Sequence, residues 1–322
     1  MEIKDRVYGV QKIEENVILD LINSNSLKRL KDISQLGMPD TYLSFPGFSR
    51  YEHSLGTMIL LKKLGATLEE QVAGLLHDIS HTPFSHVIDW VVGDPTKEDY
   101  QDKIFQEFLE KSDAFDILNQ HGLNPYFISD LNNFKLLERD APKLCVDRLD
   151  YSLRQLRIEK GKELTDKILN DLCVYDNQIM FKNFKPAKLF GDSYMGLQKS
   201  SWAGDEMRSR YHILSETLKE ALNKNLIDFS FFNGTEKPIL EILNNSNNEF
   251  ILLNLSMLKN GFSVIEDNEG IELKKKFRYV DPEIKVNGGF VCLSEICKDY
   301  KKTVEYEKER NKEVKKVKII PV

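Results

Sequence analysis

Residues 68–86 read LEEQVAGLLHDISHTPFSH, a stretch that combines a buried-helix pattern with three histidines. Its apolar side chains recur at steps of three and four residues, which predicts a helix with one buried face. We expect this helix to break after Ser80, because Thr82 can cap a new helix and Pro83 fits the first position of that helix. His86 is then expected about one turn into the second helix. The stretch therefore predicts two helices with histidines grouped around the joint.

The histidines are clustered enough to indicate a site. Four of the six lie within 34 consecutive residues, where even placement would put about 0.6, and these are His53, His77, His81 and His86. The adjacent His77 and Asp78 lie about 100° apart around a helix, so both side chains reach one point only at an exposed helix end. An isolated His-Asp pair is usually a surface or capping pair. With His53 and Asp147 from other helices, however, the pair forms a nitrogen and oxygen set that suits Mn, Fe, Co, Ni or Zn.

Helical patterns dominate on both sides of this stretch. The first fifteen residues predict a short extended segment or hairpin, residues 16–37 predict two short helices with a break at 24–26, and residues 51–64 predict another helix. A long helical region is expected to continue to about residue 225. From residue 226, Asn/Gly turns and strand-like alternation predict a second module. The expected fold class is mainly α, with a helical domain over residues 1–225 and a smaller α+β module over residues 226–322.

Composition excludes several classes of protein. The chain has 322 residues and a formal net charge of −6, which is unlike a broadly basic nucleic-acid coat. No run approaches the roughly 18 uninterrupted apolar residues of a membrane helix, and the start MEIKDRVYGV lacks the apolar stretch of a secretory signal. Four cysteines without a CxxC pair indicate packing roles in a reducing compartment. We therefore expect a cytoplasmic protein with no membrane partner and no extended nucleic-acid surface, in the form of a homo-oligomer.

The segment near the C-terminus is strongly charged. Residues 298–318 contain nine Lys or Arg and five Asp or Glu. This pattern predicts a solvated helix or an edge strand, and a contact surface for an acidic partner is the alternative.

Four segments together resemble the HD-domain deoxynucleoside triphosphate triphosphohydrolases, the family of the bacterial dGTPases and of the animal HD enzyme that depletes deoxynucleotides. The segments are SQLG (34–37), FPGFSRYEHSLG (45–56), AGLLHDISHTPFSH (73–86) and VDRLDY (146–151). The His-Asp pair is generic to the superfamily, whereas RYEHSLG, HTPFSH and VDRLDY together are characteristic of this branch. The resemblance spans roughly residues 5–220. It implies an HD-domain helical core and the hydrolysis of a dNTP to deoxynucleoside and triphosphate.

Carried over residue by residue, the resemblance implies a metal centre and a phosphate-binding pair. One divalent cation, whose identity among Mn, Mg, Fe, Co, Ni and Zn stays open, would be held by His53, His77, Asp78 and Asp147. Arg50 and Arg148 would hold phosphate oxygens, a role that the fixed fork of a guanidinium suits. The alternatives are that Arg50 caps its helix or pairs with Glu52, and that Arg148 pairs with Asp150 or with a neighbouring helix.

The resemblance also implies the groups that act on the substrate. His81 and His86 would line the reaction centre near the α-phosphate, with Asp89 orienting one of them. An imidazole suits a proton transfer because its unperturbed pKa lies near 6.5. Three further residues would border the sugar, although the last could equally be a core aromatic: Gln35, Leu36 and Tyr151. Asp150 is interpreted as structural, since it can pair with Arg154 one helical turn away.

Two positions depart from the family pattern and widen the possible substrates. Lys97 stands where the family usually has a His that assists the reaction, and a Lys ammonium suits phosphate binding better than proton donation near neutral pH. Gln155 stands where the family tends to have an Asp that reads the sugar 3′-hydroxyl, which an amide can still hydrogen-bond. The alternatives are therefore hydrolysis of another nucleotide or phosphate ester, and a non-catalytic nucleotide-binding module. Weaker candidates for phosphate contacts lie on a later helix: Arg208, Arg210 and Tyr211.

Overall fold

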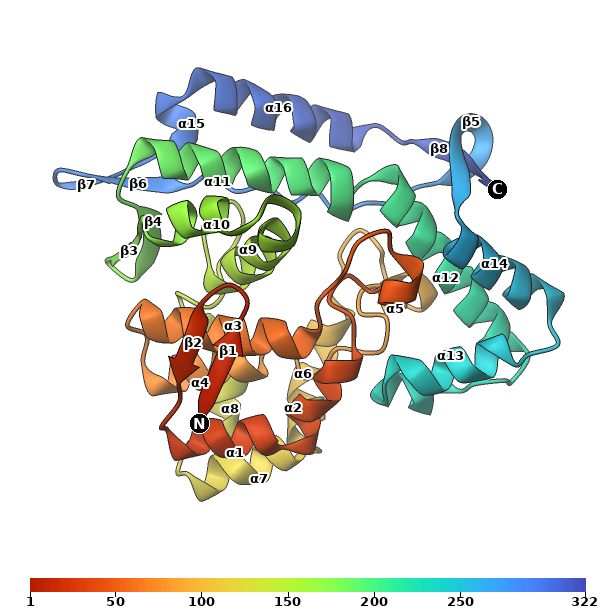
Figure 1. The fold of residues 1–322 in the computed structure, drawn as a ribbon, viewed down its shortest axis with the longest axis horizontal. Coiled ribbons are helices and arrows are strands. Elements are labelled where there is room, and N and C mark those ends of the chain that lie inside the picture. Colours follow the sequence, from red (N-terminus) through yellow and green to blue (C-terminus); the bar gives the residue numbers. More distant parts are fainter.

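The protein is described by a computed structural model of residues 1–322, in which helices predominate (Figure 1). The N-terminal half opens with the strands β1 (Glu2–Asp5) and β2 (Gly9–Lys12). Its helices are α1 (Asn16–Asn23), α2 (Asn25–Arg29), α3 (Arg50–Lys63), α4 (Leu68–Leu76), α5 (Val87–Val91), α6 (Tyr100–Glu110), α7 (Asp113–Gln120), α8 (Pro125–Ser129), α9 (Val146–Lys160) and α10 (Lys162–Leu169).

The second half mixes helices and short strands. The strands are β3 (Leu172–Tyr175), β4 (Gln178–Phe181), β5 (Phe262–Glu272), β6 (Glu283–Val286), β7 (Gly289–Cys292) and β8 (Lys316–Pro321). The helices are α11 (Phe184–Leu197), α12 (Asp205–Asn223), α13 (Glu236–Asn244), α14 (Glu249–Asn260), α15 (Leu293–Ile296) and α16 (Lys298–Lys312), with a π-helical turn at Gln198–Trp202 between α11 and α12. No helix is both long and apolar enough to cross a membrane.

The strands form three small sheets, two of which join distant parts of the chain. β1 pairs with β2 and β5 pairs with β8, both antiparallel. The third sheet has the order β3-β4-β6-β7, and its parallel step joins Phe181 on β4 to Ile284 on β6. The segment after residue 226 therefore shares a sheet with the preceding part of the chain, and α16 lies alongside α11 in Figure 1. The division of the chain near residue 225 stays a prediction.

Two buried apolar clusters form the interior. The larger lies among α1, α3, α4, α9 and α11, and the smaller lies among α5, α12, α13 and α14. Tyr151 on α9 and Trp202 pack against the larger cluster, whereas Met207 and Tyr211 on α12 belong to the smaller one. All four line a single cavity, so the cavity lies where the two clusters meet.

The mainly helical class and much of the element order agree with the sequence predictions. The N-terminal hairpin forms, and α3 matches the predicted 51–64 helix to within one residue at each end. The predicted break at 24–26 is reduced to Ser24, because α2 already begins at Asn25. The side chain of Ser24 accepts a hydrogen bond from Leu27 N at 3.2 Å, which caps α2. Both helices and strands occur after residue 226, and the charged segment forms α16 and the start of β8.

The joint after the His-Asp pair differs from the prediction. α4 ends at Leu76 rather than after Ser80, and α5 begins at Val87 rather than at Pro83. Phe84 and Ser85 adopt left-handed φ values of 63° and 48°, which no continuing helix allows. Tertiary contacts fix this turn, because Ser85 Oγ donates to Ser34 O at 2.8 Å and accepts from Arg50 Nε at 2.7 Å.

The predicted long helical region is interrupted by a hairpin. β3 and β4 are joined by Asp176 and Asn177, whose φ values are 47° and 54°. Two successive left-handed residues are typical of a type I′ turn, and Asp and Asn are among the few residues that tolerate this conformation. The Asp-Asn pair was therefore a turn signal that the helical interpretation of this region missed.

Gly56 allows α3 and α9 to cross closely enough to bury an ion pair between them. A Cβ at this position would lie 1.8 Å from Arg154 Nη2 and 2.1 Å from Asp150 Oδ1, far inside van der Waals contact. Arg154 and Asp150 are fully buried and are joined by a hydrogen bond of 2.7 Å between Nε and Oδ2. The close approach of the two helices therefore requires glycine at this position.

Gly56→Ala is expected to lower the free energy of unfolding by about 3–5 kcal/mol, the cost of disrupting a buried ion pair. Urea denaturation of the purified protein measures this change. Gly196→Ala is the matched control, because Gly196 also lies inside a helix and a Cβ there meets no atom within 4 Å. The control should be neutral or more stable by up to about 1 kcal/mol. Equal stability of the two variants would contradict the packing role of Gly56.

Candidate functional site

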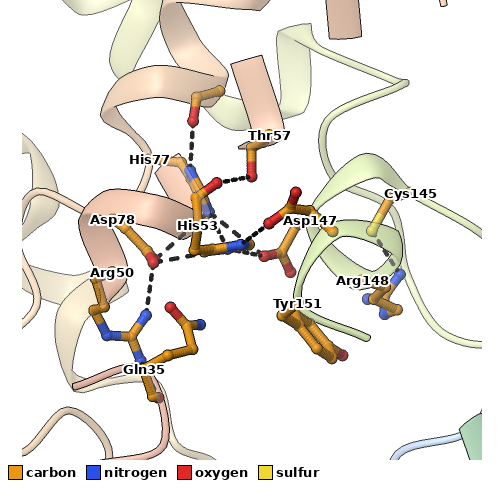
Figure 2. A network of polar contacts seen from close by, with 12 residues as sticks. Gln35, Arg50, His53, Thr57, His77, Asp78, Cys145, Asp147, Arg148 and Tyr151 are labelled. Atoms are coloured by element: carbon orange, nitrogen blue, oxygen red, sulfur yellow. Dashed lines mark hydrogen bonds and ion pairs between the residues drawn. The ribbon is translucent and has the colours of Figure 1, made fainter. Parts of the chain in front are cut away.

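Three of the four predicted metal ligands, His53, His77 and Asp147, offer ligand atoms within 4.8 Å of one another, and the fourth, Asp78, lies beside them (Figure 2). His53 projects from α3, His77 and Asp78 follow directly after α4, and Asp147 lies in the first turn of α9. His53 Nε2 lies 3.2 Å from His77 Nε2 and 3.0 Å from Asp147 Oδ1. The oxygens of Asp78 lie 3.6 Å from His77 Nε2 and 3.8 Å from His53 Nε2. Two imidazole nitrogens and two carboxylates therefore face one small volume.

The hydrogen bonds on the far side of each ring indicate that these nitrogens are suited to a cation. His53 Nδ1 lies 2.8 Å from Asp150 Oδ2, and His77 Nδ1 lies 2.8 Å from the carbonyl oxygen of Gly74. Both partners are acceptors, so each Nδ1 carries the proton and, in the neutral ring, each Nε2 presents a lone pair. Two lone pairs 3.2 Å apart repel each other unless a positive charge lies between them. The donor set thus fits a divalent metal ion.

The balance of charges around the four candidate ligands also favours a divalent cation. Arg50 and Arg154 contribute two positive charges, against four carboxylates that belong to Asp5, Asp78, Asp147 and Asp150. With neutral imidazoles, the cluster carries an excess of two negative charges, the amount that a divalent cation neutralises. Burial disfavours a charged His53, but hydrogen bonds with Asp147 and Asp150 outweigh burial and raise the pKa of His53 to about 9. The carboxylates therefore favour positive charge at this point.

Arg50 holds one ligand in place. Its guanidinium is buried, and Nη1 donates to Asp78 Oδ2 at 2.7 Å, as Figure 2 shows. The other oxygen of Asp78 lies 3.3 Å from His81 Nε2. Burial, together with the Arg50 charge, lowers the pKa of His81 well below its usual range, so His81 is neutral. The pairing of Arg50 with Glu52, considered from sequence, does not occur, because Glu52 instead pairs with Arg6 at 2.7 Å.

His86 and Asp89 form the pair expected from their spacing. His86 precedes α5 and lines the cavity, and its Nδ1 lies 3.5 Å from Asp89 Oδ2. Asp89 is fully buried, and its other oxygen accepts a hydrogen bond from Tyr100 N at 3.1 Å. The rings of His81 and His86 are 5.2 Å apart, edge to face. His86 therefore reaches the cavity, whereas His81 lies behind it, against Asp78.

The cavity beside this centre has a volume of about 80 Å³. Six residues predicted to act on substrate line it, namely Gln35, Leu36, Arg50, His86, Tyr151 and Gln155. The weaker candidates Arg208 and Tyr211 also line it, whereas Arg210 points elsewhere and donates to the carbonyl oxygens of Tyr42 and Leu258. Sequence reasoning missed five lining residues: Phe48, Glu98, Trp202, Met207 and Arg278.

Arg148 does not line the cavity. Its guanidinium donates to Glu138 Oε1 at 3.1 Å, to Cys145 Sγ at 3.2 Å and to Lys143 O at 3.0 Å. Figure 2 shows the contact between its guanidinium and the sulfur of Cys145. Glu138, Cys145 and Asp147 also offer ligand atoms within 4.8 Å of one another, but the Arg148 guanidinium already bonds two of these side chains. The alternative partner Asp150 is bonded to Arg154 instead.

Glu98, rather than its neighbour Lys97, lines the cavity. Glu98 is buried between Arg208, at 2.9 Å, and Arg278, which comes from the segment between β5 and β6. Burial opposes ionisation of Glu98, but Arg278 and then His86 and Arg208 lower its pKa well below the usual range. One carboxylate thus faces two guanidinium groups. Lys97 is outside the cavity lining, and its carbonyl oxygen accepts from Lys276 Nζ at 2.6 Å.

The amide of Gln155 is occupied by protein partners. Its Oε1 accepts from Trp202 Nε1 at 2.7 Å, and its Nε2 donates to Ser201 Oγ at 2.7 Å and to Glu159 Oε1 at 2.8 Å. The Trp202 ring lies edge to face with the ring of Tyr151 at 5.2 Å. Gln155 therefore fixes the aromatic wall of the cavity.

Glu236, the first residue of α13, anchors the loop that carries Gln35 and Leu36. Its Oε1 accepts from Ser34 N at 2.8 Å and from Phe84 N at 3.3 Å, and its Oε2 accepts from Ser34 Oγ at 2.9 Å. Burial raises the pKa of Glu236 to about 7, although these hydrogen bonds lower it. The position of the loop is thus linked to a carboxyl group that titrates near neutral pH.

Thermal stability is expected to fall as pH rises through the range in which Glu236 ionises. Between the unfolded value of about 4.3 and the folded value of about 7, the folded chain binds more protons than the unfolded chain. The contribution of Glu236 is therefore fully present below the unfolded pKa and is lost as pH rises through the folded pKa. Glu236→Gln cannot ionise, so its Tm should decline less than that of the unmodified protein between about pH 5 and pH 8. Parallel Tm curves would contradict this linkage.

Comparison with known proteins agrees with this geometry. The HD domain model matches residues 50–152, which contain all four candidate ligands. The chain is 36% identical to uncharacterized protein YdhJ of Bacillus subtilis, over 99% of both chains. It is 28% identical to metal-dependent phosphohydrolase cns2 of Cordyceps militaris, over 89% of this chain and 85% of that one.

The fold is also shared with a solved structure. A crystal structure of a phosphohydrolase from Bacteroides thetaiotaomicron superposes with a TM-score of 0.71, over 100% of this chain and 99% of that one, at 19% sequence identity. The matched domain and the identity to a relative over the full length identify the family of this protein: the chain belongs to the HD-domain family.

Proposed function

We propose that this protein is a metal-dependent phosphohydrolase that hydrolyses dNTPs to deoxynucleoside and triphosphate. The observation that carries the proposal is the pair of imidazole nitrogens 3.2 Å apart beside a cavity lined by three arginines. A divalent cation held by the two imidazoles and two carboxylates supplies Lewis-acid polarisation of a phosphoryl oxygen. The four sequence motifs that resemble the triphosphohydrolases support the choice of dNTPs.

The guanidinium groups suit the phosphate side of the substrate. Arg208 and Arg278 share only Glu98, so one unit of positive charge is left at that end of the cavity. Arg50 is already bonded to Asp78, and its Nη2 lies beside the carbonyl oxygen of Gln35 at the cavity wall. The planar guanidinium groups bind and orient a polyphosphate. Arg208 and Arg278 thus take the phosphate-binding role that the family resemblance implied for Arg148.

His86 suits the proton transfer. Hydrolysis at the α-phosphorus breaks the bond to the 5′ oxygen of the nucleoside, and that oxygen leaves more readily when it is protonated. His86 lines the cavity, and Asp89 Oδ2 lies 3.5 Å from its Nδ1, where a small shift would let the carboxylate orient the ring. Tyr151, Leu36 and Gln35 also line the cavity, and we assign the sugar to them.

A second candidate is hydrolysis of a smaller phosphate ester, such as a nucleoside monophosphate. Two observations favour it. The cavity of about 80 Å³ is smaller than the roughly 300–1,000 Å³ of typical ligand sites. Both N–H groups of the Gln155 amide are also taken, by Ser201 and Glu159, and its oxygen already accepts from Trp202, so it has no free N–H for a sugar hydroxyl.

Product analysis separates these activities. The purified protein is incubated with each dNTP, NTP and nucleoside monophosphate in the presence of Mn²⁺, Mg²⁺ or Co²⁺, and the products are identified by chromatography. Release of inorganic triphosphate from dNTPs supports the first proposal. Release of orthophosphate alone, from monophosphates or other esters, supports the second. Nucleotide binding without any product contradicts both and leaves a non-catalytic binding module.

A further inference from the structure

A chain of buried polar contacts leads from the metal ligand His53 to the N-terminal hairpin. His53 Nδ1 donates to Asp150 Oδ2 at 2.8 Å, and Arg154 Nε donates to the same oxygen at 2.7 Å. The other oxygen of Asp150 accepts from the hydroxyl of Tyr8 at 2.7 Å. Arg154 Nη2 in turn donates to Asp5 Oδ2 at 2.6 Å. His53, Asp150 and Arg154 have no exposed surface, so water does not compete for these contacts.

At the hairpin, this series of contacts ends on Asp5, which is held in place by its own hydrogen bonds. Asp5 is the last residue of β1, and its Oδ1 accepts from the amides of Val7 and Tyr8 at 2.7 and 2.9 Å. One carboxylate oxygen of Asp5 therefore shapes the turn between β1 and β2, while the other binds Arg154. The guanidinium of Arg154 also lies 5.8 Å from the centre of the Tyr8 ring. The turn cannot move without disturbing the partners of Asp150.

Asp150 has three donors and therefore a single orientation. A carboxylate that accepts from His53, Arg154 and Tyr8 at once presents one oxygen to the imidazole at a defined angle. Such an acceptor fixes the tautomer and the ring orientation of a metal-binding His and increases its basicity. The spacing of Asp150 and Arg154 along α9 would explain a helix ion pair, but it would not explain the contacts to His53 and Tyr8.

We propose that Asp150 is a positioning residue for the metal ligand His53 and that the N-terminal hairpin, through Tyr8, Asp5 and Arg154, braces it. The inference rests on the metal centre of the proposed function. The hairpin is thereby part of the metal site, although it contributes no ligand.

The test is the affinity of the apoprotein for Mn²⁺ in calorimetric titration. Tyr8→Phe removes one hydroxyl without changing charge. Because this hydroxyl bonds Asp150 rather than His53 itself, we expect Kd to rise about 10-fold, the lower end of the range for losing an outer partner of a metal-bound His. Asp150→Asn should raise Kd about 100-fold. Tyr300→Phe is the matched control, because it also removes one buried, hydrogen-bonded hydroxyl. That hydroxyl donates to Val280 O at 2.5 Å and takes no part in the contacts between His53 and the hairpin. It should leave Kd unchanged.

A second control separates bracing from general loosening of the hairpin. Arg157 Nη2 donates to Val7 O at 3.0 Å but touches neither Asp150 nor His53. Arg157→Met should therefore lower Tm while Kd stays as in the unmodified protein. Amide exchange of Val7 and Tyr8 gives an independent readout, because Mn²⁺ should slow their exchange in the unmodified protein and much less in Tyr8→Phe.

The outcomes separate this inference from the proposed function. If the unmodified protein binds no metal, the proposed function fails. If it binds metal and Tyr8→Phe matches Tyr300→Phe in Kd, the metal centre stands and the bracing role is overturned. If Asp150→Asn does not fold, Tyr8→Phe still decides the question. A rise in Kd confined to Tyr8→Phe and Asp150→Asn supports the inference.

Discussion

Asp78→Ala is expected to remove both the bound metal and the turnover. Asp78 lies within 3.8 Å of both imidazole nitrogens, and it is also the carboxylate that pairs with the buried guanidinium of Arg50. Removing it takes one ligand from the centre and leaves the charge of Arg50 without its partner. Metal content per chain by mass spectrometry and the rate of phosphate-ester hydrolysis measure the two losses.

Two further variants make this result interpretable. Asp78→Asn keeps the shape and the hydrogen bond with Arg50, so the protein should fold while binding metal more weakly than the unmodified chain. Asp116→Ala removes a carboxylate from the surface helix α7, and it should leave metal content and rate unchanged. One full equivalent of metal in Asp78→Ala would disprove its assignment as a ligand.

His86→Ala is expected to lower the rate by about 10²–10⁴, the usual contribution of general acid–base catalysis. His86 faces the cavity with Asp89 behind it and lies outside the four ligands, so metal content should stay near normal. Steady-state kinetics at saturating metal, together with metal analysis of the same sample, test both statements.

The matched control is His212→Ala. His212 is a half-buried histidine on α12 whose ring packs 6.3 Å from Trp90, outside the cavity lining. Its replacement should leave the rate unchanged. An unchanged rate in His86→Ala would instead mean that His81 or water supplies the proton.

The histidine cluster, together with the resemblance to the triphosphohydrolases, was enough to predict which side chains form the candidate metal centre. His53, His77, Asp78 and Asp147 lie on or directly beside helices whose apolar faces are evident in the sequence, so their convergence follows from packing those faces together. Asp150 was interpreted through its neighbour Arg154 alone, because a spacing of four residues satisfies it locally. Its contacts with His53 and Tyr8 span 97 and 142 residues, and a local pattern contains no sign of them.

The cavity wall was less predictable than the metal centre. Arg278 and Trp202 reach it from an irregular segment and a π-helical turn, neither of which has a periodic pattern. The same holds for the turn at Phe84 and Ser85, where bonds to Ser34, Arg50 and Glu236 override the helix-start signal of Thr82-Pro83. In each case contacts between distant segments decide the conformation.

His53 and Gly56 lie one turn apart on α3, and Asp147 and Asp150 lie one turn apart on α9. The point at which the two helices cross therefore also determines how far the imidazole stands from the carboxylate. The absence of a Cβ at Gly56 is therefore a condition for the geometry of the candidate metal site as well as for the packing of the two helices. The size of cation that the proposed site would accept thus depends on the separation of two helix backbones, and not only on the four side chains that would bind it.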